Sequence, residues 1–181
     1  MVEITLSDFN DQNNLTTAEV DSSIYIRVNG RGSFRNSPAL KEYVKKQLSN
    51  KSTKKILIDM NCCVGMDSTF MGVLAGLAGM TKKTSRHSFS LINLSKKNEK
   101  LLITLGVSKI LNYTSKKSNS ISEKIDEDDL LVLPSNQNKT TQVSLDAHKK
   151  LIEIDPSNKK EFKSVIELLE KDLKKSKDKK W

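Results

Sequence analysis

Hydrophobic and polar positions alternate in short stretches over the first two thirds of the chain. A period of two is typical of strands, and a short apolar run rich in branched side chains is typical of a buried strand. Strands are predicted on this basis at residues 2–6, 24–28, 55–60, 88–94 and 110–113. The polar, turn-rich stretch 10–21 is predicted to be a loop.

Helical spacing separates several of these strands. Ser37-Pro38 resembles a helix start, with proline in the first turn. A further helix is predicted at residues 98–105, closed by Gly106, and another from residue 68 onwards. Strands that alternate with helices predict an α/β fold, in which helices cover one face of a mixed β-sheet.

The pattern changes after Thr114. Residues 115–142 are mostly polar and are predicted to be a linker, in which residues 130–133 form either a short strand or a docked segment. Residues 143–181 are predicted to be a two-helix extension with a basic tail, broken at Asp155-Pro156. The second helix has an apolar stripe that must be buried, against the domain formed by residues 1–114 or against a second copy in a homodimer. The stripe consists of Phe162, Val165, Ile166, Leu169 and Leu173.

Composition narrows the classes of protein that this chain can belong to. Its 181 residues suffice for one ordinary domain with appendages. No stretch approaches the ~20 apolar residues of a membrane span, and no signal sequence opens the chain, so we expect a cytoplasmic protein. The net charge of +9 is spread along the sequence and aromatic residues make up only 5%, so nucleic-acid binding is not expected. No cysteine or histidine set has the spacing of a metal site.

The segment with the clearest functional pattern is Asp67-Ser68-Thr69, which joins a buried strand to an apolar helix. Asp67 or Ser68 is a natural N-cap, and a phosphate on the hydroxyls would be stabilised by the helix N-terminus. Three glycines fall on the same helical face as Ser68, namely Gly72, Gly76 and Gly79. This face is either a docking surface for a partner protein or a place where a neighbouring element approaches closely.

Residues 56–111 resemble the core of the STAS family of anti-sigma factor antagonists. The resemblance lies in the strand, Asp67-Ser68-Thr69, the glycine-containing helix after it, and the later Leu105-Gly106-Val107. It extends over about residues 2–114, and it implies a STAS-like mixed sheet. Phe70 departs from the family, which usually has glycine there.

The resemblance implies a phosphorylation switch in signal transduction and transcription regulation. Ser68, or Thr69 in its place, would be phosphorylated by an anti-sigma factor serine kinase, which the unphosphorylated protein binds, and a serine phosphatase would reverse the modification. The implied partner-binding residues are Asp67, Ser68, Thr69, Gly72, Gly76 and Gly79. The kinase brings ATP and magnesium, so no cofactor is expected.

Two other classes of function compete with the switch: a non-switching interaction module, which remains open, and an enzyme, which has weak support. STAS domains also serve as non-switching scaffolds or as subunits of lipid-transport and chemosensory assemblies. We expect no catalytic residues, because no histidine with a defined role lies near Ser68 in the sequence and no Gly-x-Ser-x-Gly motif occurs.

Overall fold

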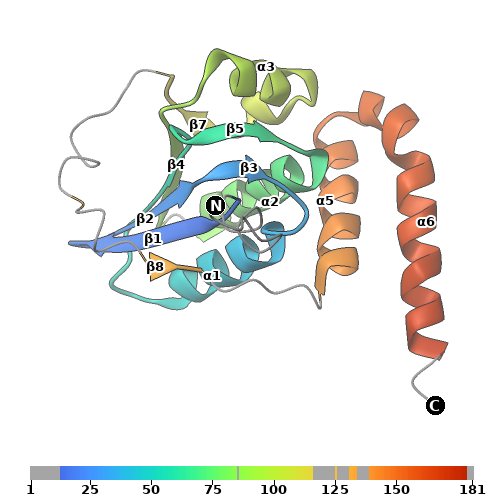
Figure 1. Cartoon of the computed structure of the whole chain (residues 1–181), viewed down its shortest axis with the longest axis horizontal. Coiled ribbons are helices and arrows are strands. Elements are labelled where there is room, and N and C mark those ends of the chain that lie inside the picture. The colour runs from blue at the N-terminus through green and yellow to red at the C-terminus, as the bar shows by residue number, and fades with distance from the viewer. Residues whose placement is uncertain (1–12, 85, 116–124, 126–130, 134–138, 179–181) are drawn as a thin grey trace, which may run out of the picture.

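The computed structural model describes residues 13–84, 86–115, 125, 131–133 and 139–178. It has a mixed α/β fold whose main sheet has six strands in the order β7-β6-β4-β2-β1-β8 (Figure 1). The main-sheet strands are β1 (Leu15–Val20), β2 (Ser23–Val28), β4 (Lys55–Asp59), β6 (Ser88–Ile92), β7 (Asn112–Tyr113) and β8 (Leu131–Val132). The α-helices are α1 (Ser37–Ser49), α2 (Ser68–Thr84), α3 (Lys96–Thr104), α5 (Thr140–Ile154) and α6 (Lys159–Asp178).

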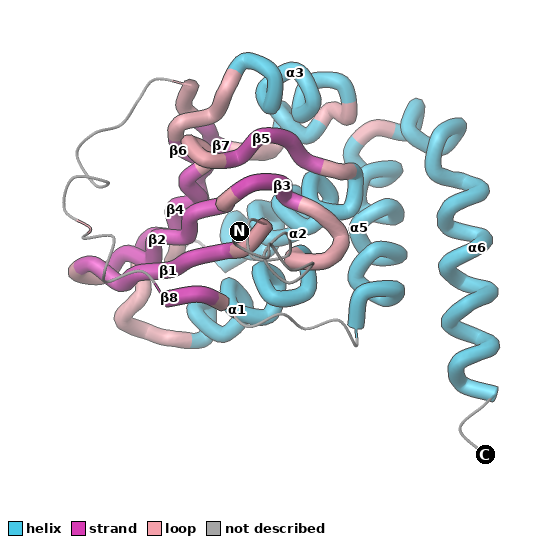
Figure 2. Tube along the Cα trace, in the orientation of Figure 1, coloured by secondary structure: helices cyan, strands magenta, loops and turns pink. Residues whose placement is uncertain are grey.

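The centre of the sheet is parallel, and its strands alternate as their sequences predict. Ile56 and Ile58 of β4 belong to the core under the helices, whereas Leu57 between them belongs to a smaller cluster on the other face. β2 lies beside β4 in register, with Ile24 opposite Ile56. Core residues of α1 and α2 complete the larger cluster, so these helices cover one face of the sheet (Figure 2).

The prediction of a loop at residues 10–21 is wrong for the described part, where β1 pairs antiparallel with β2. β1 contains two threonines that are buried, and Thr17 Oγ1 donates a hydrogen bond to the Tyr25 carbonyl at 3.0 Å. Buried hydroxyls that have hydrogen-bond partners make a polar-looking segment compatible with a sheet. A two-residue turn follows β1, and Asp21 there has φ +55°, a conformation that aspartate tolerates.

Other predicted elements are confirmed with small shifts. Helix α1 begins at Ser37 with Asn36 as its cap, one residue earlier than the Ser37 cap predicted. The short strand predicted within 130–133 is present as β8, which pairs with the outer edge of β1. A second, two-stranded sheet of β3 (Gly30–Gly32) and β5 (Cys63–Met66) was not predicted. The strand predicted at residues 2–6 lies outside the described residues.

The two predicted C-terminal helices are present and form a hairpin. α5 packs against α2, and α6 packs on the far side of α5 (Figure 1). Of the apolar stripe on α6, Phe162 is buried, while Val165, Ile166, Leu169 and Leu173 are partly exposed. The first of the two extension helices therefore makes most of the contact with α2, and Phe162 of the stripe joins the main core. That the exposed part of the stripe is buried against a second copy stays a prediction.

Candidate functional site around Ser68

The start of α2 is fixed by Asp67, which both carboxylate oxygens tie to the backbone. Oδ1 accepts from the Phe70 N–H at 2.9 Å, three residues ahead, as an N-cap side chain does. Oδ2 accepts from the Phe34 N–H at 2.8 Å, in the segment between β3 and α1. The predicted cap is thus Asp67. Both carboxylate oxygens of Asp67 have backbone partners within the fold, and this cap holds Ser68 at the first position of the helix.

Phe70, the residue that departs from the family pattern, is fully buried. Its ring lies against Gly32 of β3, where an added Cβ would come within 2.6 Å of the ring. The missing side chain of Gly32 on β3 therefore leaves the space that the Phe70 ring fills. The bulky ring does not project from the start of α2 toward a partner.

The Ser68 side chain contacts a histidine that is distant from it in the sequence. Ser68 Oγ and His148 Nε2 of α5 are 2.9 Å apart, although 80 residues separate them in the chain. The expectation that Ser68 has no histidine near it holds along the chain but is wrong in the folded protein. Ser68 is half-buried, whereas His148 is only 4% exposed.

The environment of His148 assigns the direction of this hydrogen bond. Burial lowers the pKa of His148, and this effect is opposed in part by the Ser144 carbonyl and by the charge of Asp67. His148 Nδ1 lies 2.8 Å from the Ser144 carbonyl oxygen, which can only accept. We therefore assign a neutral ring that donates from Nδ1, so Nε2 accepts from the Ser68 hydroxyl.

The next two contacts continue along the same face of α2. Thr69 is only 4% exposed, and its hydroxyl donates to Ser144 Oγ at 3.4 Å. One turn further on, Gly72 lies directly under Ala147: a Cβ at Gly72 would come within 2.5 Å of the Ala147 carbonyl oxygen. Side chains and backbone of one face of α5 thus cover the first turns of α2.

The three glycines of this face have different surroundings. Gly72 allows the close approach of α5, which is the structural alternative left open by the sequence. A Cβ at Gly76 or Gly79 would meet nothing within 4 Å. Both line an open groove of about 350 Å³ between α1, α2 and α5. Its rim is rich in charge, with Lys41, Lys45, Lys83, Lys150, Asp146 and Glu153.

A second polar cluster lies on the other face of the sheet and is satisfied internally. Asp59, at the end of β4, accepts hydrogen bonds from the Tyr25 hydroxyl, from Asn93 Nδ2 at 2.7 Å and from the Asn61 N–H at 3.0 Å. Burial and the hydrogen bond to Asp59 raise the pKa of Tyr25 above its usual value. The Asp59 carboxylate is buried, and these donors satisfy its oxygens within the fold. A structural role is therefore sufficient to explain this cluster.

Within the described residues, no group of three or more potential ligands is arranged to hold a metal ion. Both cysteines are free thiols, with Cys63 buried and Cys62 exposed. None of the described helices is long and apolar enough to cross a membrane.

The face of α5 could have been found in the sequence as a set of positions three and four apart. Ser144, Ala147, His148 and Leu151 are all buried and share that spacing. Small residues at 144 and 147 match a helix that carries glycine. The sequence does not show, however, which helix the face contacts.

Residues 14–126 match the model of the STAS domain family. In structure, the chain is similar to a Thermotoga maritima protein proposed to be an anti-sigma factor antagonist, with a TM-score of 0.52 and 20% identity, over 60% of this chain and 92% of that chain. A solution structure of the same protein gives a TM-score of 0.50 and 22% identity, over 61% and 85% of the two chains. SpoIIAA, an anti-sigma factor antagonist, matches in its unphosphorylated form with a TM-score of 0.49 and 13% identity, over 61% and 96%. None of the curated proteins is similar enough in sequence to count as a match.

Proposed function

The chain belongs to the STAS domain family, and from this premise we propose that it is an anti-sigma factor antagonist with Ser68 as its phosphorylation switch. Unphosphorylated, it binds an anti-sigma factor that is a serine kinase, and so releases a sigma factor. The kinase transfers the γ-phosphoryl group of ATP to Ser68 Oγ and releases ADP. The phosphorylated protein then no longer binds the kinase. A serine phosphatase removes the phosphate again.

The observation that supports this function is the position of Ser68 directly after a capped helix start. The Asp67 cap places the Ser68 hydroxyl at the N-terminus of α2, where the helix dipole favours an added anion. Thr69 is the weaker candidate, because it is almost fully buried and bonded to Ser144. Ser68 is half-buried, so a smaller movement of α5 exposes it.

Non-switching scaffolds of the same family are the second candidate function. The observation that favours a scaffold is the cover formed by α5, since it occupies part of the proposed partner-binding face, at Ser68, Thr69 and Gly72. Gly76 and Gly79 remain open to a partner. A scaffold of this kind would use Ser68 only as a structural residue and would never carry a phosphate on it.

Intact-mass measurement and site mapping on the protein isolated from its own cells distinguish the two candidates. We expect a fraction with one added phosphate, mapped to Ser68, and no such fraction in Ser68→Ala. Thr69→Ala is the matched control and should keep the modification. Phosphate on Thr69 alone would move the site by one residue, and its absence under all growth conditions would favour the scaffold.

A further inference from the structure

The hairpin of α5 and α6 lies where a partner of Ser68 would have to bind. Three successive contacts join α5 to the start of α2: His148 to Ser68, Ser144 to Thr69, and Ala147 to Gly72. We propose that α5 is a detachable intramolecular cover, which must leave α2 before Ser68 can be phosphorylated or bound. This inference rests on the proposed function for what the uncovered face does, but the detachment itself can be tested without it.

The STAS fold does not include a hairpin at this place. The family match ends at residue 126, before α5 begins. The Thermotoga protein matches over 92% of its own length while covering 60% of this chain. The STAS fold is therefore complete in a chain that has little beyond it, and α5 is added to its surface.

The contacts between the hairpin and the domain combine an apolar core with polar groups that can exchange their partners for water. The apolar part consists of residues that are buried in the main core, namely Val143, Ala147, Leu151 and Phe162. The ion pairs Lys41–Asp146 and Lys139–Glu42 are exposed, and such pairs contribute little in water. The hydroxyls of Ser68 and Thr69 would be solvated if α5 left, so uncovering them does not leave buried polar groups without partners.

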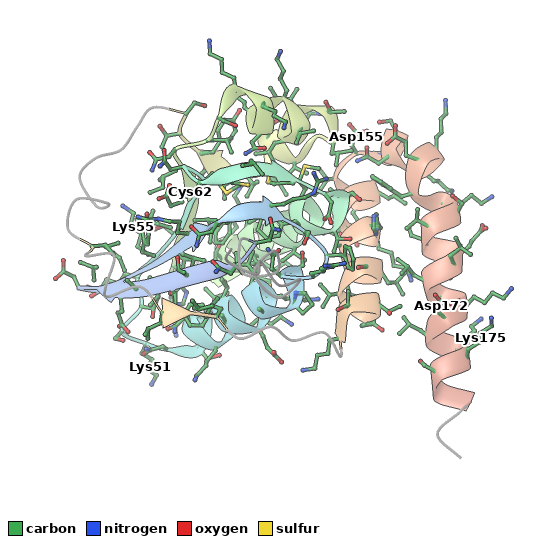
Figure 3. The ribbon with its side chains drawn as sticks, viewed as in Figure 1. Lys51, Lys55, Cys62, Asp155, Asp172 and Lys175 are labelled. Carbon is green, nitrogen blue, oxygen red and sulfur yellow. The ribbon has the colours of Figure 1, made fainter. Side chains whose placement is uncertain are left out.

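The turn of the hairpin is attached to the domain at a separate place. Asn158 is buried, and its Nδ2 donates to the Leu105 carbonyl at 3.1 Å and to the Leu151 carbonyl at 2.9 Å. Asp155, labelled in Figure 3 at the junction of α5 and α6, lies 3.9 Å from Lys109. These contacts lie at the C-terminal end of α5, whereas Ser144 and His148 lie further toward its N-terminal end. The turn can thus stay attached while the part of α5 over Ser68 moves.

A phosphate on Ser68 and the docked α5 exclude each other. The Ser68 Oγ to His148 Nε2 distance of 2.9 Å leaves no room for a phosphoryl group between them. A partner can bind this face only in molecules from which α5 has detached. The apparent affinity is therefore the intrinsic affinity multiplied by the fraction of molecules that are uncovered. A partner bound to this face favours the uncovered state by the same factor, and a phosphate on Ser68 favours it as well, by a coupling of its own.

Gly72→Ala is the substitution that tests the cover in the full chain. The added Cβ would meet backbone atoms of Ala147 at 2.5 and 2.8 Å, so α5 must shift. Gly76→Ala is the matched control, because it makes the same change one turn further along α2 and its Cβ meets nothing within 4 Å. Both substitutions favour the helical state of α2 itself.

Amide hydrogen exchange measures the detachment, with β4 as the internal reference. We expect exchange within α5 to rise about tenfold or more in Gly72→Ala, the effect of overpacking a close contact, while β4 and the Gly76→Ala variant stay unchanged. In a Cys62→Ser/Ser68→Cys background, the thiol at position 68 should react correspondingly faster with Ellman's reagent when Gly72→Ala is added. Cys63 is buried and gives the baseline.

Unchanged exchange in α5 of Gly72→Ala, or an equal rise in β4, would overturn the inference, since α5 would then be an integral part of the fold. Faster exchange without faster thiol modification would also overturn it, because α5 would not control access to position 68. The absence of phosphate on Ser68 in the native protein would refute the proposed function alone. The exchange and thiol results would still decide whether α5 detaches.

Discussion

The hydrogen bond between Ser68 and His148 should make a measurable contribution to stability, in addition to any role of Ser68 as a phosphoacceptor. Removing one partner of a buried hydrogen bond costs about 1–3 kcal/mol, because the other partner loses its hydrogen bond and is not solvated. His148 is 4% exposed, so its Nε2 falls in that class when Ser68 becomes alanine. We expect Ser68→Ala to lower the free energy of unfolding by about 1–2 kcal/mol.

His148→Ala should cost more, about 2–4 kcal/mol, because it also removes a buried ring. That ring packs on Phe162 of α6, with centroids 4.9 Å apart and an interplanar angle of 57°. The double variant isolates the direct interaction. If the two side chains bond to each other, the two losses should not add, and the coupling energy should be about 1 kcal/mol.

Urea unfolding of the unphosphorylated full chain, followed by circular dichroism, measures these energies. Ser90 provides the control, since it is a half-buried serine on β6 and is not bonded to His148. The pair Ser90→Ala and His148→Ala should be additive within about 0.5 kcal/mol. A Ser68–His148 coupling as small as that of the control pair would refute the assigned hydrogen bond, and with it the first contact of the proposed cover.

Two further results are expected around the same contact. Because burial holds the pKa of His148 below its ordinary value of 6.5, docking of α5 is most stable above that pH and weakens as the pH falls through the lowered pKa. The ratio of hydrogen exchange in α5 to that in β4 should therefore rise as the pH is lowered. The variant His148→Asn should lose this pH dependence, and the control His87→Asn should keep it. A ratio that does not change with pH would contradict the assignment of a neutral His148 ring. Secondly, Ser68 should not react with a fluorophosphonate probe, because the groove lining begins only at Gly72 and His148 is buried. Labelling that is lost in Ser68→Ala but kept in Thr69→Ala would instead identify a nucleophilic serine paired with His148.

The sequence by itself determined the elements whose signals are local. Strands β2, β4 and β6 follow from runs of apolar and branched side chains, and the start of α2 follows from Asp67, whose side chain caps the helix three residues ahead. The break at Asp155-Pro156 divides the two C-terminal helices for the same reason, since proline restricts the residue before it. In each case the physical cause acts over a few residues and can be recognised without knowing the rest of the fold.

Only the tertiary structure decided which of these local features meet. β1 is a strand because its backbone pairs with β2 along its whole length, and Thr17 also finds a backbone partner there; its own sequence does not show this pairing. The glycines on α2 are equivalent in sequence, but α5 lies over Gly72 and leaves Gly76 open. His148 contacts Ser68 across 80 residues, because the packing of α5 against α2 brings them together. Contacts between distant segments depend on the packing of whole faces, and a periodic pattern shows that a face is buried without showing what buries it.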